Sequence, residues 1–157
     1  MVCAGTGLAP FIGFVQERAI RIATSGAKSE DFAEAILIVG CRYPDKDRIY
    51  GEQLAKWEAE GVVKVLYAYS RAPEKSDGCK YAQDRLWHER ETISRLFDAG
   101  ARAYICGSSS LGKGVADAAA RMAIEGARKK GKEYSYEQGL QWWEHLRGER
   151  YAVDVFD

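Results

Sequence analysis

Short, continuous apolar runs recur along the chain and predict β-strands. Runs of this kind are typical of strands that are buried on both faces of a parallel sheet. The predicted strands cover residues 35–39, 62–69, 102–106 and 150–156, and the opening residues Met1-Val2 form the end of one more. Polar stretches separate these runs, among them residues 27–34 and a loop that holds Pro73 and Gly78.

Helical spacing of apolar residues fills the intervals between the predicted strands. Helices are expected over residues 49–60, 83–98 and 111–126. The first helix has Pro10 in its first turn and Gly26 as its stop, and one face carries Phe11, Phe14, Val15, Ala19 and Ile22. Ser135 and Gln138 fit a capping box for the last helix, which follows a basic bridge at residues 128–132 and carries Leu140, Trp143 and Leu146.

Strands and helices therefore alternate, which predicts an α/β fold. We expect a doubly wound parallel sheet of about five strands with helices on both faces. Residues 1–157 form one domain in this interpretation, because a chain of this length can bury a real core. Ligands bind such sheets at the carboxyl ends of the strands, so the strand ends supply the candidate site residues.

The first strand ends in Gly5-Thr6-Gly7, directly before a helix. A glycine turn at this place leaves backbone amides free to hold a phosphate. The segment differs from the usual dinucleotide fingerprint because Pro10 stands where the third glycine belongs. A steric connection between a strand and a helix is the alternative interpretation of this turn.

Positive charge follows the second and third strands. The second strand ends in Gly40-Cys41-Arg42, where an NAD-selective site favours an acidic residue. The third is followed by Ser70-Arg71 and later by Lys80, Tyr81 and Gln83. A hydroxyl, a guanidinium, an ammonium and a phenol together suit a phosphate monoester and its attached base. A solvated polar loop is the alternative.

The fourth and fifth strands end in residues of a different kind. Cys106-Gly107 closes one strand, and Asp154 and Phe156 lie on the same side of the other. A cysteine at a strand end is more often a small buried apolar residue than a reactive group. A carboxylate beside a terminal aromatic residue also fits simple polarity at a fraying end.

Composition excludes several classes of function. The formal net charge is zero, which does not favour nucleic acid or an anionic membrane as the main partner. No apolar run approaches the roughly 18 residues that cross a bilayer, and no signal peptide opens the chain. Four cysteines without Cys-x-x-Cys spacing and two distant histidines argue against a metal site. Reduced thiols in a cytoplasmic setting are the default.

Taken together, these segments resemble the NADPH-binding lobe of the diflavin reductases. The nearest pattern is NADPH–cytochrome P-450 reductase, and the terminal Asp-Val-Phe-Asp is most similar to the reductase half of the self-sufficient fungal fatty-acid hydroxylases. The resemblance covers essentially the whole chain. It rests on Gly-Thr-Gly-Leu-Ala-Pro-Phe, Gly-Phe-Val-Gln-Glu-Arg-Ala, Gly-Cys-Arg, Ser-Arg, Tyr-x-Gln, Tyr-Ile-Cys-Gly and the terminal Arg-Tyr-x-x-Asp-Val-aromatic segment.

The resemblance implies a role for each strand end. Gly5, Thr6 and Gly7 border the pyrophosphate and nicotinamide end of NADP(H), and Arg42 contacts its phosphate region. The residues implied to bind the 2′-phosphoadenosine end are Ser70, Arg71, Lys80, Tyr81 and Gln83. Cys106 and Asp154, with Gly107 beside them, sit at the nicotinamide, and Phe156 takes the place of the aromatic that stacks on FAD.

The chain departs from the commonest pattern of that family in four places. Cys3-Ala4 replaces a Gly-Pro pair, and Phe156 replaces a tryptophan, which leaves less area for stacking. Lys80 lies one residue closer to Tyr81 than usual, which puts its reach to the 2′-phosphate in question. Ser108 stands where an aspartate is usual, so that contact is not carried over.

The resemblance also implies a longer parent protein. The FAD-binding barrel, the FMN domain and the haem domain that accepts electrons belong to that parent, and the fragment alone is expected to bind NADP(H) without transferring electrons. A sulfite reductase or nitric oxide synthase-type flavoprotein is one alternative parent. A non-catalytic nucleotide-binding module and a short-chain dehydrogenase are alternatives of other classes. No Tyr-x-x-x-Lys pair follows a strand, which disfavours the dehydrogenase.

Overall fold

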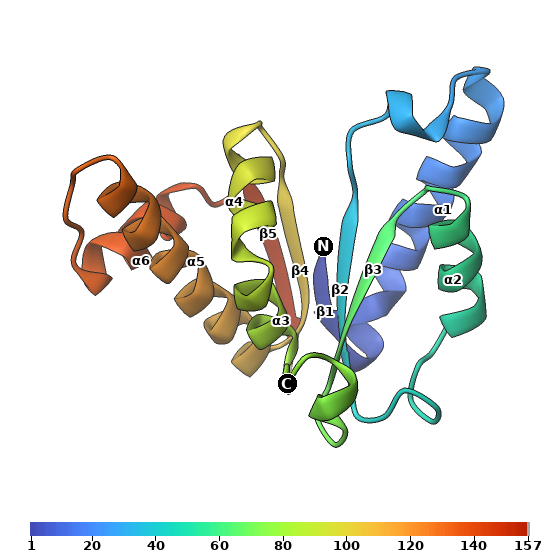
Figure 1. The fold of residues 1–157 in the computed structure, drawn as a ribbon, viewed down its shortest axis with the longest axis horizontal. Helices are drawn as coiled ribbons and strands as arrows, with labels where there is room; N and C mark the ends of the chain where they lie inside the picture. Colours follow the sequence, from blue (N-terminus) through green and yellow to red (C-terminus); the bar gives the residue numbers. More distant parts are fainter. Residues whose placement is uncertain (157) are drawn as a thin grey trace.

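A computed structural model describes residues 1–156 of the protein. Its centre is a five-stranded sheet in which every pair of neighbouring strands is parallel, in the order β3-β2-β1-β4-β5 (Figure 1). The strands are β1 (Val2–Ala4), β2 (Ile36–Cys41), β3 (Lys64–Tyr69), β4 (Ala103–Ser108) and β5 (Tyr151–Phe156). The predicted parallel α/β fold is confirmed.

Helices cover both faces of the sheet, and they divide according to chain order. The α-helices are α1 (Ala9–Ser25), α2 (Gly51–Ala59), α3 (Ala82–His88), α4 (Arg90–Asp98), α5 (Ser109–Lys129) and α6 (Tyr136–His145). Short 3-10 turns are η1 (Gly5–Leu8), η2 (Ser29–Asp31) and η3 (Pro73–Lys75). Helices α1 and α2 pack on one face, and α3, α5 and α6 pack on the other (Figure 1).

The continuous apolar run in β2 reflects burial on both faces. Ile36 and Ile38 belong to the core beneath α3 and α5, whereas Leu37 and Val39 belong to the core beneath α1 and α2. Successive side chains of a strand point to opposite faces, so a strand between two helical layers needs apolar residues at every position.

The chain reverses its direction of travel across the sheet at β1. Strands β2 and β3 extend the sheet on one side of β1, and β4 and β5 extend it on the other. Such a switch point opens a crevice at the carboxyl ends of the strands, where ligands of α/β proteins bind. These ends meet at the lower edge of the sheet in Figure 1.

Several predicted boundaries are wrong. The helix expected over residues 83–98 is two helices, α3 and α4, with Glu89 between them at φ −89° and ψ 12°. Helix α2 begins at Gly51, which leaves Ile49 in the preceding loop. Arg128 and Lys129, assigned to a basic bridge, form the last turn of α5. Phe14, placed on the inner face of α1, is 49% exposed.

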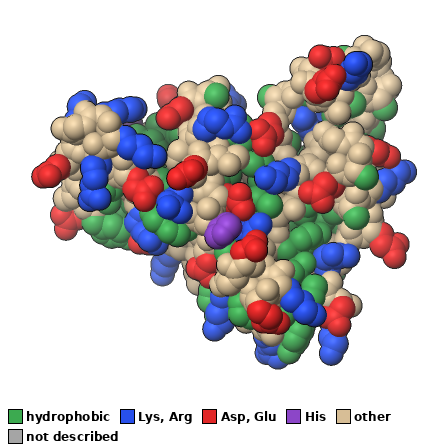
Figure 2. All heavy atoms as spheres, viewed as in Figure 1, with side chains coloured by type: hydrophobic (Ala, Val, Ile, Leu, Met, Phe, Trp, Pro, Cys, Tyr) green, Lys and Arg blue, Asp and Glu red, His purple; other side chains and the backbone are tan. Residues whose placement is uncertain are grey.

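The surface carries both signs of charge. Figure 2 shows acidic and basic side chains interspersed over the face in view, in keeping with a formal net charge of zero. Among residues 1–156, no helix combines the length and the apolar character needed to cross a bilayer.

Candidate nucleotide-binding site

The Gly-Thr-Gly turn lies at the carboxyl edge of the sheet, between β1 and α1. Gly5 adopts a left-handed φ of 56°, and η1 leads directly into α1, with Pro10 in the first helical turn as predicted. A Cβ atom at Gly7 would stand 2.2 Å from the carbonyl oxygen of Cys106. The turn therefore lies directly against the end of β4, and only glycine permits this approach.

Backbone hydrogen bonds between β2 and β3 continue past the last strand pair, Cys41 and Tyr69, as far as Arg42 and Arg71. The amide of Ser70 donates to the carbonyl of Cys41 at 2.9 Å, and the amide of Arg71 donates to the carbonyl of Arg42 at 3.0 Å. Both arginines are exposed, and Arg42 also pairs with Asp47 at 3.1 Å. Two guanidiniums thus follow adjacent strand ends, which suits a phosphate group.

The start of α3 brings a second group of polar residues to the same edge. Tyr81 immediately precedes the helix and is 47% exposed, and the Lys80 ammonium lies 5.4 Å from the centre of its ring. Gln83 packs against Gly114 of α5, where an added Cβ would meet the Gln83 side chain at 2.8 Å. Tyr81 is therefore accessible at the start of α3 with Lys80 beside its ring, and Gln83 is held near α5.

Strands β4 and β5 position the other predicted group. Cys106 and Asp154 are register partners, as are Ser108 and Phe156. Cys106 is buried, whereas Asp154 is exposed and Phe156 is 46% exposed. A shielded thiol, a solvated carboxylate and an accessible aromatic ring therefore share one side of this strand pair.

Burial governs the chemistry of the thiols. It raises the pKa of Cys106, and the carboxylate of Asp154 raises that pKa further. Burial likewise raises the pKa of Cys3, which pairs with Cys106 across β1 and β4, to about 12. Both side chains are neutral thiols at neutral pH. Cys106 is consequently a packing group or weak hydrogen-bond partner rather than a thiolate nucleophile.

The order of the strands sets the order of the groups. Arg42 and Arg71 follow β2 and β3, the glycine turn follows β1, and Cys106 and Asp154 belong to β4 and β5. Four steps of about 4.8 Å separate the outer strands, or roughly 19 Å. A span of this length fits an extended dinucleotide.

The structure reveals two residues at the site that sequence reasoning missed. Ser76 is buried, at 4% exposure, in the loop between β3 and α3, and its hydroxyl accepts from the amide of Tyr69 at 3.0 Å. Asp84 accepts from the amides of Lys80 and Tyr81 at 3.1 and 2.8 Å. The Asp84 cap had a sequence signal, an acidic residue three positions after the N-cap residue Tyr81, whereas Ser76 had none.

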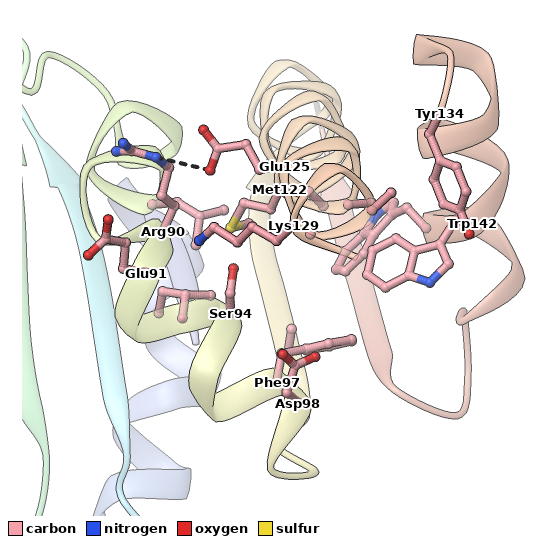
Figure 3. Close-up of a pocket in the computed structure, with 18 of the residues that line it drawn as sticks. Arg90, Glu91, Ser94, Phe97, Asp98, Met122, Glu125, Lys129, Tyr134 and Trp142 are labelled. Atoms are coloured by element: carbon pink, nitrogen blue, oxygen red, sulfur yellow. Dashed lines mark ion pairs between the residues drawn. The ribbon is translucent and has the colours of Figure 1, made fainter. Parts of the chain in front are cut away.

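A separate apolar cavity of about 370 Å³ lies between α4, α5 and α6 (Figure 3). Phe97, Met122 and Trp142 line it. An ion pair at 3.3 Å joins Arg90 of α4 to Glu125 of α5. The cavity reaches the sheet at Val2 of β1 and Ala103 of β4, the amino ends of those strands. The cavity is thus at the opposite edge of the sheet from the candidate site.

The histidines, cysteines and carboxylates of residues 1–156 form no group of three that could hold a metal ion. The four cysteines are all free in this part of the chain. The candidate site therefore offers cations, amides, a carboxylate and aromatic rings, a set that suits a nucleotide.

A family model supplies the decisive comparison. Residues 1–117 match the oxidoreductase NAD-binding domain. The chain belongs to this family. Membership in the oxidoreductase NAD-binding domain family agrees with the five-stranded parallel sheet.

Curated relatives are large fusion proteins. A bifunctional cytochrome P450/NADPH–P450 reductase of Fusarium oxysporum is 47% identical over 156 residues, which cover 99% of this chain. A protein of the same description from Acremonium egyptiacum is 44% identical over 158 residues, and a self-sufficient cytochrome P450 monooxygenase of Phanerodontia chrysosporium is 40% identical over 158 residues. The chain spans 14% of the length of each. The predicted resemblance to the reductase region of fungal fusions is confirmed.

Proposed function

We propose that this chain binds NADPH and presents it for hydride transfer to FAD, as one lobe of a reductase that passes electrons through FMN to a cytochrome P450 haem domain. One observation carries most of the weight: the amide of Arg71 bonds to the carbonyl of Arg42, so two guanidiniums follow adjacent strand ends. They lie on the β2–β3 side of the glycine turn, where the adenosine half of an extended dinucleotide belongs.

The residues at the β2 end favour NADP(H) over NAD(H). Gly40-Cys41-Arg42 ends this strand with a cation, where an acidic residue would hold the hydroxyls of an unphosphorylated ribose. The partner of Arg42 is Asp47 in an exposed pair, and such pairs contribute about 0–1 kcal/mol. A doubly charged phosphate can therefore compete for Arg42 and for the neighbouring Arg71.

The opposite side of the crevice suits the reacting end. NADPH, when bound, supplies the hydride. The exposed carboxylate of Asp154 would lie beside the nicotinamide and would favour the positive charge that develops during hydride transfer. Buried Cys106 packs beside it, and the Phe156 ring at the end of β5 is accessible for stacking on a flavin.

Titration calorimetry tests the selectivity. The fragment is expected to bind 2′,5′-ADP more tightly than 5′-AMP, and NADP⁺ more tightly than NAD⁺. Arg71→Ala should cost about 1.5–3 kcal/mol for the phosphorylated ligand, the scale of a charge-assisted hydrogen bond. Arg21→Ala is the matched control, because Arg21 is an exposed arginine near the far end of α1. Equal affinity of the fragment for 2′,5′-ADP and 5′-AMP would contradict the proposal.

A second experiment tests whether the FAD site lies outside this chain, in another part of the proposed parent protein. The purified fragment should be colourless and should not reduce ferricyanide or cytochrome c with NADPH, because the proposed FAD site belongs to another part of the parent. An absorption spectrum checks the first expectation and a steady-state assay the second. A stoichiometric flavin spectrum in the fragment would overturn this division.

A further inference from the structure

The loop between β3 and α3 connects both halves of the proposed phosphate site. It leaves the sheet at Ser70-Arg71 and enters α3 through Lys80-Tyr81. Internal backbone bonds make it compact: the amides of Ser76 and Gly78 both donate to the carbonyl of Pro73 at 2.9 Å. A compact, bonded loop of this kind holds its two ends at a fixed separation.

Ser76 is the buried centre of this loop. Its hydroxyl accepts from the amide of Tyr69 at 3.0 Å and lies 2.8 Å from the carbonyl oxygen of Cys79, to which it donates. Tyr69 directly precedes Ser70-Arg71, and Cys79 directly precedes Lys80-Tyr81. One hydroxyl therefore links the two backbone segments that carry the proposed phosphate ligands.

Asp84 fixes the second of these segments. Its Oδ2 atom accepts from the amides of both Lys80 and Tyr81, at 3.1 and 2.8 Å. Asp77 at the loop tip has a left-handed φ of 53° and is held by Arg85 of α3. Side chains of α3 thus secure the loop from the helix side, while Ser76 secures it from within.

We propose that Ser76 and Asp84 are positioning residues for recognition of the 2′-phosphate, and that they act by fixing Arg71 relative to Lys80 and Tyr81 before the nucleotide binds. This inference rests on the proposed function. The physical reason is preorganisation: a ligand that must order a loose loop and its long cationic side chains loses affinity to that ordering. Loosening the loop should therefore weaken only the contacts to the 2′-phosphate, because the glycine turn and β4 are not part of this loop.

Phosphate selectivity is the readout that separates positioning from general destabilisation. It is the Kd for 5′-AMP divided by the Kd for 2′,5′-ADP, measured by calorimetry on the fragment. Ser76→Ala is expected to lower this ratio roughly tenfold, the scale of one lost buried hydrogen bond. The matched control is Ser135→Ala, which removes a serine cap of α6 far from the crevice and should leave the ratio unchanged.

A double-mutant cycle with Arg71→Ala makes the test decisive. If Ser76 acts by positioning Arg71, Ser76→Ala should change 2′,5′-ADP affinity less than twofold once Arg71 is gone. Full additivity of the two substitutions would overturn the inference while leaving the proposed function intact. No effect of Arg71→Ala by itself would instead contradict the proposed function.

Asp84 provides an independent variant should Ser76→Ala fail to fold. Asp84→Ala should lower the ratio several-fold, and Asp84→Asn should restore most of it because the amide oxygen still accepts from the backbone. Asp31→Ala is the control, since Asp31 accepts from the Lys28 amide at 3.0 Å in the same manner but in a remote turn. An unchanged ratio in Asp84→Ala would refute the role assigned to this residue.

Discussion

Cys106 on β4 and Asp154 on β5 are register partners, so a thiol and a carboxylate lie side by side at the carboxyl edge of the sheet. The thiol is buried and the carboxylate is exposed. Burial raises the pKa of the thiol and the neighbouring carboxylate raises that pKa further, so the thiol stays protonated at neutral pH. Asp154 is the exposed member of the pair and therefore the one that the proposed cofactor would meet.

Asp154→Asn should therefore slow hydride transfer in the proposed parent reductase without weakening binding of the 2′-phosphate. The neutral amide no longer favours positive charge in the transition state, and a loss of roughly tenfold corresponds to about 1.4 kcal/mol. Stopped-flow flavin reduction measures the rate, and calorimetry measures 2′,5′-ADP affinity, which should stay within twofold. A parallel fall in both quantities would indicate a structural role for Asp154 instead.

Gly7→Ala should damage both stability and nucleotide binding. The new Cβ would stand 2.2 Å from a backbone oxygen of β4, a contact that only movement of the turn can relieve. We expect a loss of about 1–3 kcal/mol in the free energy of unfolding, measured by urea denaturation.

Gly13→Ala is the control for that substitution. Gly13 lies within α1, and an added Cβ meets nothing within 4 Å, so the change should stabilise the protein by up to about 1 kcal/mol. If both alanine variants had equal stability, the close approach of η1 to β4 would not constrain the protein.

Buried Cys3 should make the fold sensitive to alkali. Its pKa is about 12 in the folded state, against an ordinary value of 9.0, so the unfolded chain loses this proton first as pH rises. The contribution of protonated Cys3 to the free energy of unfolding is complete below pH 9 and is lost between about pH 9 and 12. The free energy of unfolding then falls by at most about 1.4 kcal/mol per pH unit.

Urea denaturation at several pH values between 8 and 11 checks this expectation. Cys3→Ala should lower stability at every pH through the lost packing. As pH rises, however, the stability of this variant should fall less steeply than that of the unsubstituted protein. Burial raises the pKa of Tyr67 to about 12 and that of Cys41 to about 11, and both contributions are common to the two proteins. If the free energy of unfolding fell equally steeply with pH in both proteins, Cys3 would not be a source of the sensitivity to alkali.

Phe156→Ala tests whether the terminal aromatic residue controls access of the nicotinamide to the flavin. If Phe156 stacks on the flavin as proposed, its ring would occupy the place of the nicotinamide, and binding of the 2′-phosphate end would help to displace it. NADH lacks that phosphate, so removal of the ring should raise NADH-driven flavin reduction relative to NADPH-driven reduction and slow NADP⁺ release. Stopped-flow measurements on the parent check both effects. An unchanged NADH-to-NADPH ratio would refute gating by Phe156.

The parts of the fold that could be predicted follow from local rules. The apolar run through Ile36 and Val39 predicts a strand buried on both faces, and Gly26, in left-handed conformation, ends α1 as expected. The Ser135 and Gln138 capping box also forms as predicted. Each signal lies within a few residues, where propensity and periodicity decide.

The features that were missed depend on tertiary contacts. The break at Glu89 has no glycine or proline to announce it, and Arg85 pairs with Glu89 at 3.2 Å across the junction. Ser76 looks like any serine of a polar loop, and only the folded chain buries it and brings its hydroxyl to the amide of Tyr69. Phe14 satisfies the helical pattern of α1, yet it lies beyond the buried stripe and meets Tyr104 edge-on at 5.6 Å.

One side of β5 is open to water along its length, since Ala152, Asp154 and Phe156 are all exposed. Two unit charges 4 Å apart interact by about 1 kcal/mol in water but by about 4 kcal/mol at an effective dielectric constant of 20. The field of Asp154 is thus damped by solvent on the open strand, and a surface that closes over β5 would multiply it severalfold. Exposure keeps the electrostatic power of this carboxylate low until the strand is covered.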